Sequence, residues 1–105
     1  MTHLPVTCTL SQPDLARRRA GLFAELARRR QEARWLFEGV ALRYSSEQGT
    51  LALLGEFIQL ERQCCPFLRF QLTVEPGGGP IWLELTGPAG TREFLAHEVG
   101  DPGTV

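Results

Sequence analysis

The chain has 105 residues and a formal net charge of −1. A single domain of this length can bury a hydrophobic core without staples, and a charge so close to zero gives no general attraction to nucleic acid or to a membrane surface. No apolar run reaches the roughly 20 residues that a membrane-spanning helix needs. The first residues also lack the pattern of a signal peptide. We therefore expect a cytoplasmic protein that uses neither nucleic acid nor membrane as a partner.

The first half of the chain alternates between strand and helix patterns. Residues 4–10 alternate apolar and polar side chains, which predicts a strand with Cys8 on its buried face. Residues 11–32 begin with a capping pattern and carry apolar residues at helical spacing, which predicts a helix. A pair of strands is expected next, residues 34–37 and 40–45, because a glutamate–glycine turn separates them.

The second half repeats this alternation. A helix is expected to begin near Ser45 or Ser46 and to end near Cys64, because Pro66 disfavours helical geometry in the residue before it. Two alternating strands and a short final helix follow, at residues 67–75, 81–86 and 87–100. In the strand at 67–75 the alternation places Leu68, Phe70, Leu72 and Val74 on one face and Arg69, Gln71, Thr73 and Glu75 on the other.

This order of elements predicts an α+β domain over residues 1–100. We expect a mainly antiparallel sheet of four or five strands, three helices covering one face, and a relative of the ferredoxin-like fold. Residues 101–105 are expected to form a frayed tail. The open face of the sheet is polar except for one tryptophan, which suggests solvent or a partner: Thr7, Thr9, Arg69, Gln71, Thr73, Trp82 and Glu84.

The eleven basic residues are all arginines, and six of them form two runs, 17–19 and 28–30. The two runs lie on similar sides of the first predicted helix. Because the net charge is close to zero, we interpret them as a solvated helix face rather than as a nucleic-acid site.

The three cysteines are the most informative residues. An odd number fits a disulfide framework poorly, and in a reducing compartment the thiols are expected to stay free. Judged singly, each cysteine is typical of a buried packing residue.

The adjacent pair Cys64–Cys65 changes this interpretation. Pro66 breaks the helix next to the pair, so the two sulfur atoms can turn toward each other or toward one ligand. If the first strand lies beside the strand after Pro66, Cys8 joins them. Thiolate ligands select soft or borderline ions, and neither histidine has the spacing of a zinc ligand. The pattern favours a two- or three-thiolate site for a larger soft ion.

The position of the pair disfavours a redox nucleophile. The carboxyl end of a helix carries partial negative charge, which raises the pKa of a thiol. Glu61 adds to this effect, and Arg62 and Arg69 oppose it. An enzyme that acts on an organometallic compound or an electrophile would need a proton donor near the sulfur atoms, and Glu61 is the candidate that lies close in sequence.

Three segments carry a resemblance to known proteins: "CTL" near the start, "ERQCCPF", and "GGGPIWLELTGPAGTREFL". In this pattern the chain resembles a group of small, mostly uncharacterised bacterial proteins that occur near heavy-metal resistance genes, particularly those for mercury. The resemblance covers nearly the whole chain, and the cysteine segment is its most specific part. It implies Cys8, Cys64 and Cys65 as the group to test for metal binding.

Two functions from different classes follow. The first is binding of a soft metal ion, Hg(II) or a similar ion, by Cys64 and Cys65 with Cys8 as third ligand, for sequestration or hand-off without required turnover. The second is a dimerisation or protein-interaction module, homodimer formation included. Its surface would be the open sheet face around Trp82 and Arg69, and the cysteines would only pack.

Overall fold

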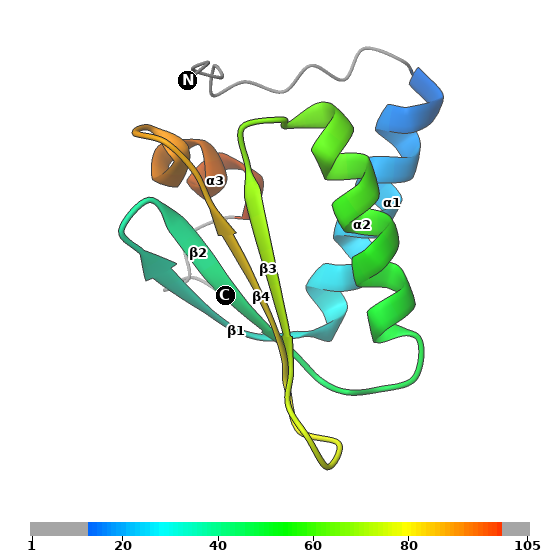
Figure 1. Ribbon diagram of the computed structural model, residues 1–105. Helices are drawn as coiled ribbons and strands as arrows, with labels where there is room; N and C mark the ends of the chain where they lie inside the picture. The colour runs from blue at the N-terminus through cyan, green and yellow to red at the C-terminus, as the bar shows by residue number, and fades with distance from the viewer. Residues whose placement is uncertain (1–12, 100–105) are drawn as a thin grey trace.

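The computed structural model describes residues 13–99, which form an α+β domain with three helices and a four-stranded antiparallel sheet (Figure 1). In chain order the elements are α1 (Pro13–Arg29), β1 (Arg30–Leu36), β2 (Gly39–Tyr44), α2 (Thr50–Cys64), β3 (Arg69–Val74), β4 (Ile81–Thr86) and α3 (Thr91–Val99). The predicted α+β class is confirmed. The expected strand at 4–10 and the expected tail at 101–105 lie outside the described residues.

The sheet has the strand order β1-β2-β4-β3, and every neighbouring pair is antiparallel. The run α1-β1-β2-α2-β3 follows the order of the last five elements of a ferredoxin-like unit. β4 then returns between β2 and β3, so that the two outer strands are β1 and β3.

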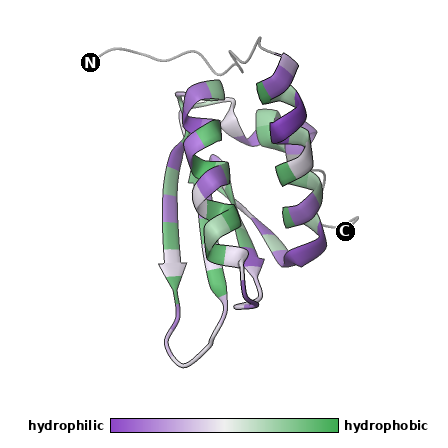
Figure 2. Ribbon diagram, turned by 90° about the vertical axis from the view of Figure 1, so that its right-hand side faces the viewer, coloured by the Kyte–Doolittle hydropathy of each residue, from purple (hydrophilic) through white to green (hydrophobic). Residues whose placement is uncertain are grey.

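One face of the sheet packs against α1 and α2, which lie side by side (Figures 1 and 2). The alternating burial along β4 shows which side chains enter this layer, because Ile81, Leu83 and Leu85 are buried and the residues between them are half-exposed. These three residues join buried side chains of α2 and β2 in one hydrophobic core, which also contains both cysteines of the pair.

The first helix is shorter than predicted, and the strand after it is longer. α1 ends at Arg29, and β1 begins at the next residue without a connecting loop. Arg30 already pairs with Tyr44 in the sheet. Arginine, glutamine and glutamate are good helix formers, so helical spacing continues to residue 32, but Arg30 and Glu32 pair with β2, and this tertiary pairing overrides their helical propensity.

The second helix begins later than predicted. α2 starts at Thr50 after Gly49, whose φ of 92° lies in the left-handed region that favours glycine. Ser46 is instead held in the preceding loop, where its hydroxyl donates a hydrogen bond of 2.7 Å to the carbonyl oxygen of Gly78. The predicted end at Cys64 is confirmed.

The apolar residues of β3 point in the predicted direction but are covered only in part. Leu72 lies opposite Leu83, and Val74 lies opposite Ile81, so both point to the helix-covered face. They nevertheless remain 41% and 53% exposed, respectively. The predicted facing of these residues is confirmed, but Leu72 and Val74 are not core residues, because the helix layer does not extend over the outer side of this edge strand.

Candidate functional site

The cysteine pair lies where α2 ends. Cys64 is the last residue of the helix and Cys65 is its C-cap, and both are fully buried. The Cys65 N–H donates a hydrogen bond of 2.6 Å to the Glu61 carbonyl oxygen. The Cys65 carbonyl accepts one of 3.1 Å from the N–H of Leu68, which closes the turn around Pro66. Backbone bonds on both sides thus fix the turn, and both side chains enter the core.

The two sulfur atoms differ in oxidation state. Cys64 is disulfide-bonded, whereas Cys65 is a free thiol. The expectation that all thiols stay free is therefore wrong for Cys64. Of the three predicted metal ligands, the structure brings Cys64 and Cys65 together, and Cys8 lies outside the described residues.

A carboxylate completes the group. The Sγ atom of Cys65 lies 3.6 Å from the Sγ of Cys64 and 3.6 Å from Oε2 of Glu61. One helical turn separates Glu61 from Cys65, so the two side chains lie on the same side of α2. Glu61 is only 2% exposed. The candidate site is thus a buried cluster of two sulfur atoms and one carboxylate.

Arg19 of α1 neutralises this buried carboxylate. Its Nε donates to Oε1 of Glu61 at 2.5 Å, and its Nη2 lies 3.1 Å from Oε2 of Glu98 in α3. The guanidinium also lies over the Phe23 ring, 4.5 Å from the centroid. Burial opposes the charge of Arg19, but Glu61 and Glu98 outweigh it and raise the pKa of Arg19. This ion-pair network joins all three helices next to the thiols.

The sequence interpretation missed Arg19, because it treated the run 17–19 as a solvated face. In the structure the Arg19 side chain is 15% exposed, whereas those of Arg17 and Arg18 are 76% and 58% exposed. A signal was present in the spacing. Arg19 lies four residues after Leu15 and three before Leu22, which places it on the apolar stripe of α1.

The free thiol is held in its protonated form. Burial raises the pKa of Cys65 to about 12, and the negative charge of Glu61 adds to this shift. The expected direction of the shift agrees with this pKa, although burial is the larger cause. Since the thiolate is the nucleophile, Cys65 is not activated for thiol exchange at neutral pH.

These properties predict how the thiols react with iodoacetamide. In the denatured protein without reductant, iodoacetamide should label Cys65 and not Cys64, and after reduction it should label both, because Cys65 is a free thiol and Cys64 is disulfide-bonded. In the native protein Cys65 should react about a hundredfold more slowly at neutral pH than in the unfolded chain. Its rate should keep rising above pH 9.0, where an ordinary thiol levels off. Labelling of Cys64 without reductant, or a plateau near pH 9.0, would contradict the prediction. Mass spectrometry of peptides identifies each labelled residue.

Within residues 13–99, no group of three or more histidine, cysteine, aspartate or glutamate side chains is placed to hold a metal ion. A third ligand to a metal at the pair would therefore come from a small rearrangement or from outside this range. Over the same part of the chain, none of the helices has the length and apolar character to span a membrane.

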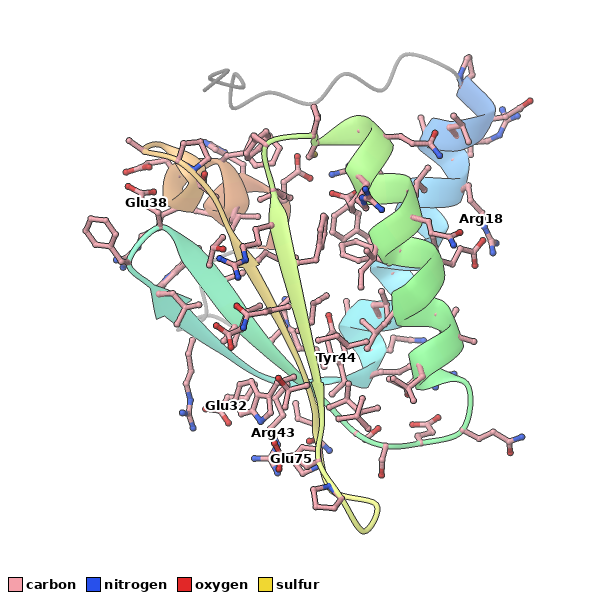
Figure 3. The ribbon with its side chains drawn as sticks, in the orientation of Figure 1. Arg18, Glu32, Glu38, Arg43, Tyr44 and Glu75 are labelled. Atoms are coloured by element: carbon pink, nitrogen blue, oxygen red, sulfur yellow. The ribbon has the colours of Figure 1, made fainter. Side chains whose placement is uncertain are left out.

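The open face of the sheet offers a less distinct surface. Trp82 is half-buried there, and the guanidinium of Arg34 covers its ring at 5.2 Å from the centroid. Arg43 and Glu32 lie beside each other on the same face (Figure 3), with Nη1 of Arg43 3.7 Å from Oε1 of Glu32. Charged side chains thus cover the aromatic residue that the sequence had suggested as a partner-binding centre.

Comparisons with protein-family models, with curated proteins and with solved structures give no match for this chain. The candidate site therefore rests on its own geometry: two adjacent sulfur atoms, a carboxylate and an arginine, buried together at the end of α2.

Proposed function

We propose that the reduced form of this protein binds a soft, thiophilic metal ion, Hg(II) or a similar ion, through Cys64 and Cys65, and that it sequesters the ion or hands it on. The observation that carries the proposal is the separation of 3.6 Å between the two sulfur atoms. Two thiolates of a tetrahedral zinc site, with metal–sulfur bonds of about 2.3 Å, lie about 3.8 Å apart. A larger soft ion held by two thiolates would require the two sulfur atoms of the pair to move farther apart.

The surroundings of Cys65 support metal capture rather than thiol exchange. A thiol whose pKa is about 12 stays protonated at neutral pH unless a tightly bound ion displaces its proton, and a soft metal ion binds sulfur tightly enough to do so. The Glu61 carboxylate, 3.6 Å from the sulfur, is placed to accept that proton. Arg19 keeps this carboxylate in position next to the site.

The disulfide of Cys64 makes binding depend on the redox state. A disulfide sulfur offers no thiolate, so the oxidised chain has one thiol ligand at the pair and the reduced chain has two. Cys8, the third cysteine of the sequence, lies outside the described residues. In the reduced chain it would supply the third thiolate of the proposed site.

Native mass spectrometry tests the proposal. Protein reduced with a phosphine is mixed with one equivalent of Hg(II) and an excess of glutathione, which competes away ions held by a single thiol. The wild type should retain one ion per chain, and the variant Cys64→Ser/Cys65→Ser should retain none. Equal retention by both proteins would discard the proposal. Cys8→Ser is the matched control, because it removes one thiol and leaves the pair.

The alternative, an interaction module on the open sheet face, has less support. The Arg34 guanidinium over Trp82 reduces the apolar surface that this residue can offer.

A further inference from the structure

The two edge strands of the sheet differ in their protection against pairing with another chain. β1 carries charged side chains along its length and a register shift between Arg30 and Glu32, both of which discourage an added strand. β3 pairs with β4 without a register shift and contains no proline. Its residues Leu72 and Val74 are exposed. Within residues 13–99, β3 is therefore an edge strand with exposed apolar side chains, at the front of the domain in Figure 1.

The backbone groups that point outward from β3 can be identified. The N–H of Glu75 donates a hydrogen bond of 3.2 Å to the carbonyl oxygen of Pro80, in the direction of β4. Hydrogen-bonded positions alternate along an antiparallel pair. Phe70, Leu72 and Val74 therefore direct their N–H and C=O groups away from β4, toward the free edge.

We propose that two copies of this chain associate through β3, in an antiparallel pair whose two-fold axis passes beside Leu72. In this register Leu72 lies opposite Leu72 of the second copy, and Phe70 lies opposite its Val74. All three are outward-pointing positions, so each of the three facing pairs exchanges two N–H···O=C bonds. The facing side chains lie on the helix-covered side and bury one another's exposed apolar surface.

Charges on the other side of β3 favour this register. A two-fold axis beside Leu72 places Arg69 opposite Glu75 of the second copy, and this happens twice because the pair is symmetric. Both residues are exposed, and Glu75 lies where β3 leads into the hairpin (Figure 3). Moving the axis to Gln71 or Thr73 places Arg69 opposite Thr73 or Gly77 instead, and the charge match is lost.

The resulting sheet would have eight strands and would run continuously through both copies. The helices of both copies would lie on the same side, because paired residues in an antiparallel ladder share a face. When two copies of β3 pair, apolar side chains face apolar side chains and Arg69 faces Glu75. This double match is specific to a second copy of this chain. A strand from an unrelated protein would share only the backbone pattern.

Charge reversal tests the proposed register. In sedimentation velocity over a dilution series, the wild type should shift from a species of 11.7 kDa to one of twice that mass as the concentration rises. Arg69→Glu and Glu75→Arg, each alone, place like charges opposite each other twice and should raise the dissociation constant about tenfold. The double variant Arg69→Glu/Glu75→Arg restores opposite charges and should dimerise like the wild type.

Two controls complete the test. Arg17→Glu changes the net charge by the same amount as Arg69→Glu, at an exposed position of α1, and should leave association unchanged. Trp82→Ala removes the aromatic side chain of the open sheet face and should also leave association unchanged. A wild type that stays monomeric throughout the series overturns the proposal. So does a dimer that the Arg69 and Glu75 variants leave intact, and so does one that Trp82→Ala dissociates.

Discussion

Replacing Arg19 with methionine should lower the free energy of unfolding by about 3–5 kcal/mol, because it leaves the charge of Glu61 buried without its partner. The Glu61 side chain is 3% exposed, and Arg19 donates to it at 2.5 Å. Methionine retains an unbranched apolar side chain that can still contact Phe23. The loss of stability should therefore arise from the unpaired Glu61 carboxylate and not from a cavity. Chemical denaturation followed by circular dichroism measures it.

Arg18→Met is the matched control. Arg18 is the preceding residue of α1 and pairs with Glu56 of α2, but the two side chains are 58% and 39% exposed. Figure 3 shows Arg18 on the outer side of α1. An exposed ion pair contributes roughly 0–1 kcal/mol, so this variant should lose at most that amount. Equal losses in the two variants would show that Arg19 contributes to stability no more than a surface arginine does.

Gly39→Ala should be the second strongly destabilising change, with an expected loss of about 2–4 kcal/mol. A Cβ atom at Gly39 would lie 2.1 Å from the carbonyl oxygen of Leu85 and 2.8 Å from Cγ2 of Thr86. The first of these atoms belongs to the backbone of β4, so the new methyl group forces β2 and β4 apart. The pairing of β2 with β4 holds the centre of the sheet together.

The same substitution at Gly55 should have the opposite sign. Gly55 is an exposed residue inside α2, and no atom lies within 4 Å of a Cβ built there. Alanine should stabilise the helix by about 0.5–1 kcal/mol, because glycine loses more backbone freedom on folding. Thermal and chemical unfolding of both variants provide the comparison. A shift of the same sign at the two positions would contradict the close approach of Gly39 to β4.

The location of the thiol pair could be read from local chemistry. Pro66 ends α2 wherever the rest of the chain lies, and the adjacent cysteines therefore stand at a helix end in any fold that retains this helix. Glu61, one turn earlier, is close to Cys65 for the same reason. The sequence also suggested the direction of the Cys65 pKa, since the helix end and Glu61 both favour the neutral thiol.

The pairing of Arg19 with Glu61 could not be predicted from local chemistry, because it depends on how α1 packs against α2. Three consecutive arginines on α1 have the same side-chain chemistry, and although its spacing places Arg19 on the apolar stripe, nothing in the local sequence shows that its partner is Glu61 of α2. The angle at which α1 crosses α2 selects Arg19 to meet Glu61.

The class of the fold and the type of nearly every element followed from periodicity, because alternation and helical spacing are local properties of the chain. Periodicity did not show how deeply each strand or helix is buried. Leu72 and Leu83 both lie in alternating strands and face each other across β3 and β4, yet one is 41% exposed and the other is fully buried. The difference arises from the return of β4 between β2 and β3, which leaves β3 at the edge. Strand order is a property of the assembled sheet, and pairs far apart in the sequence establish it.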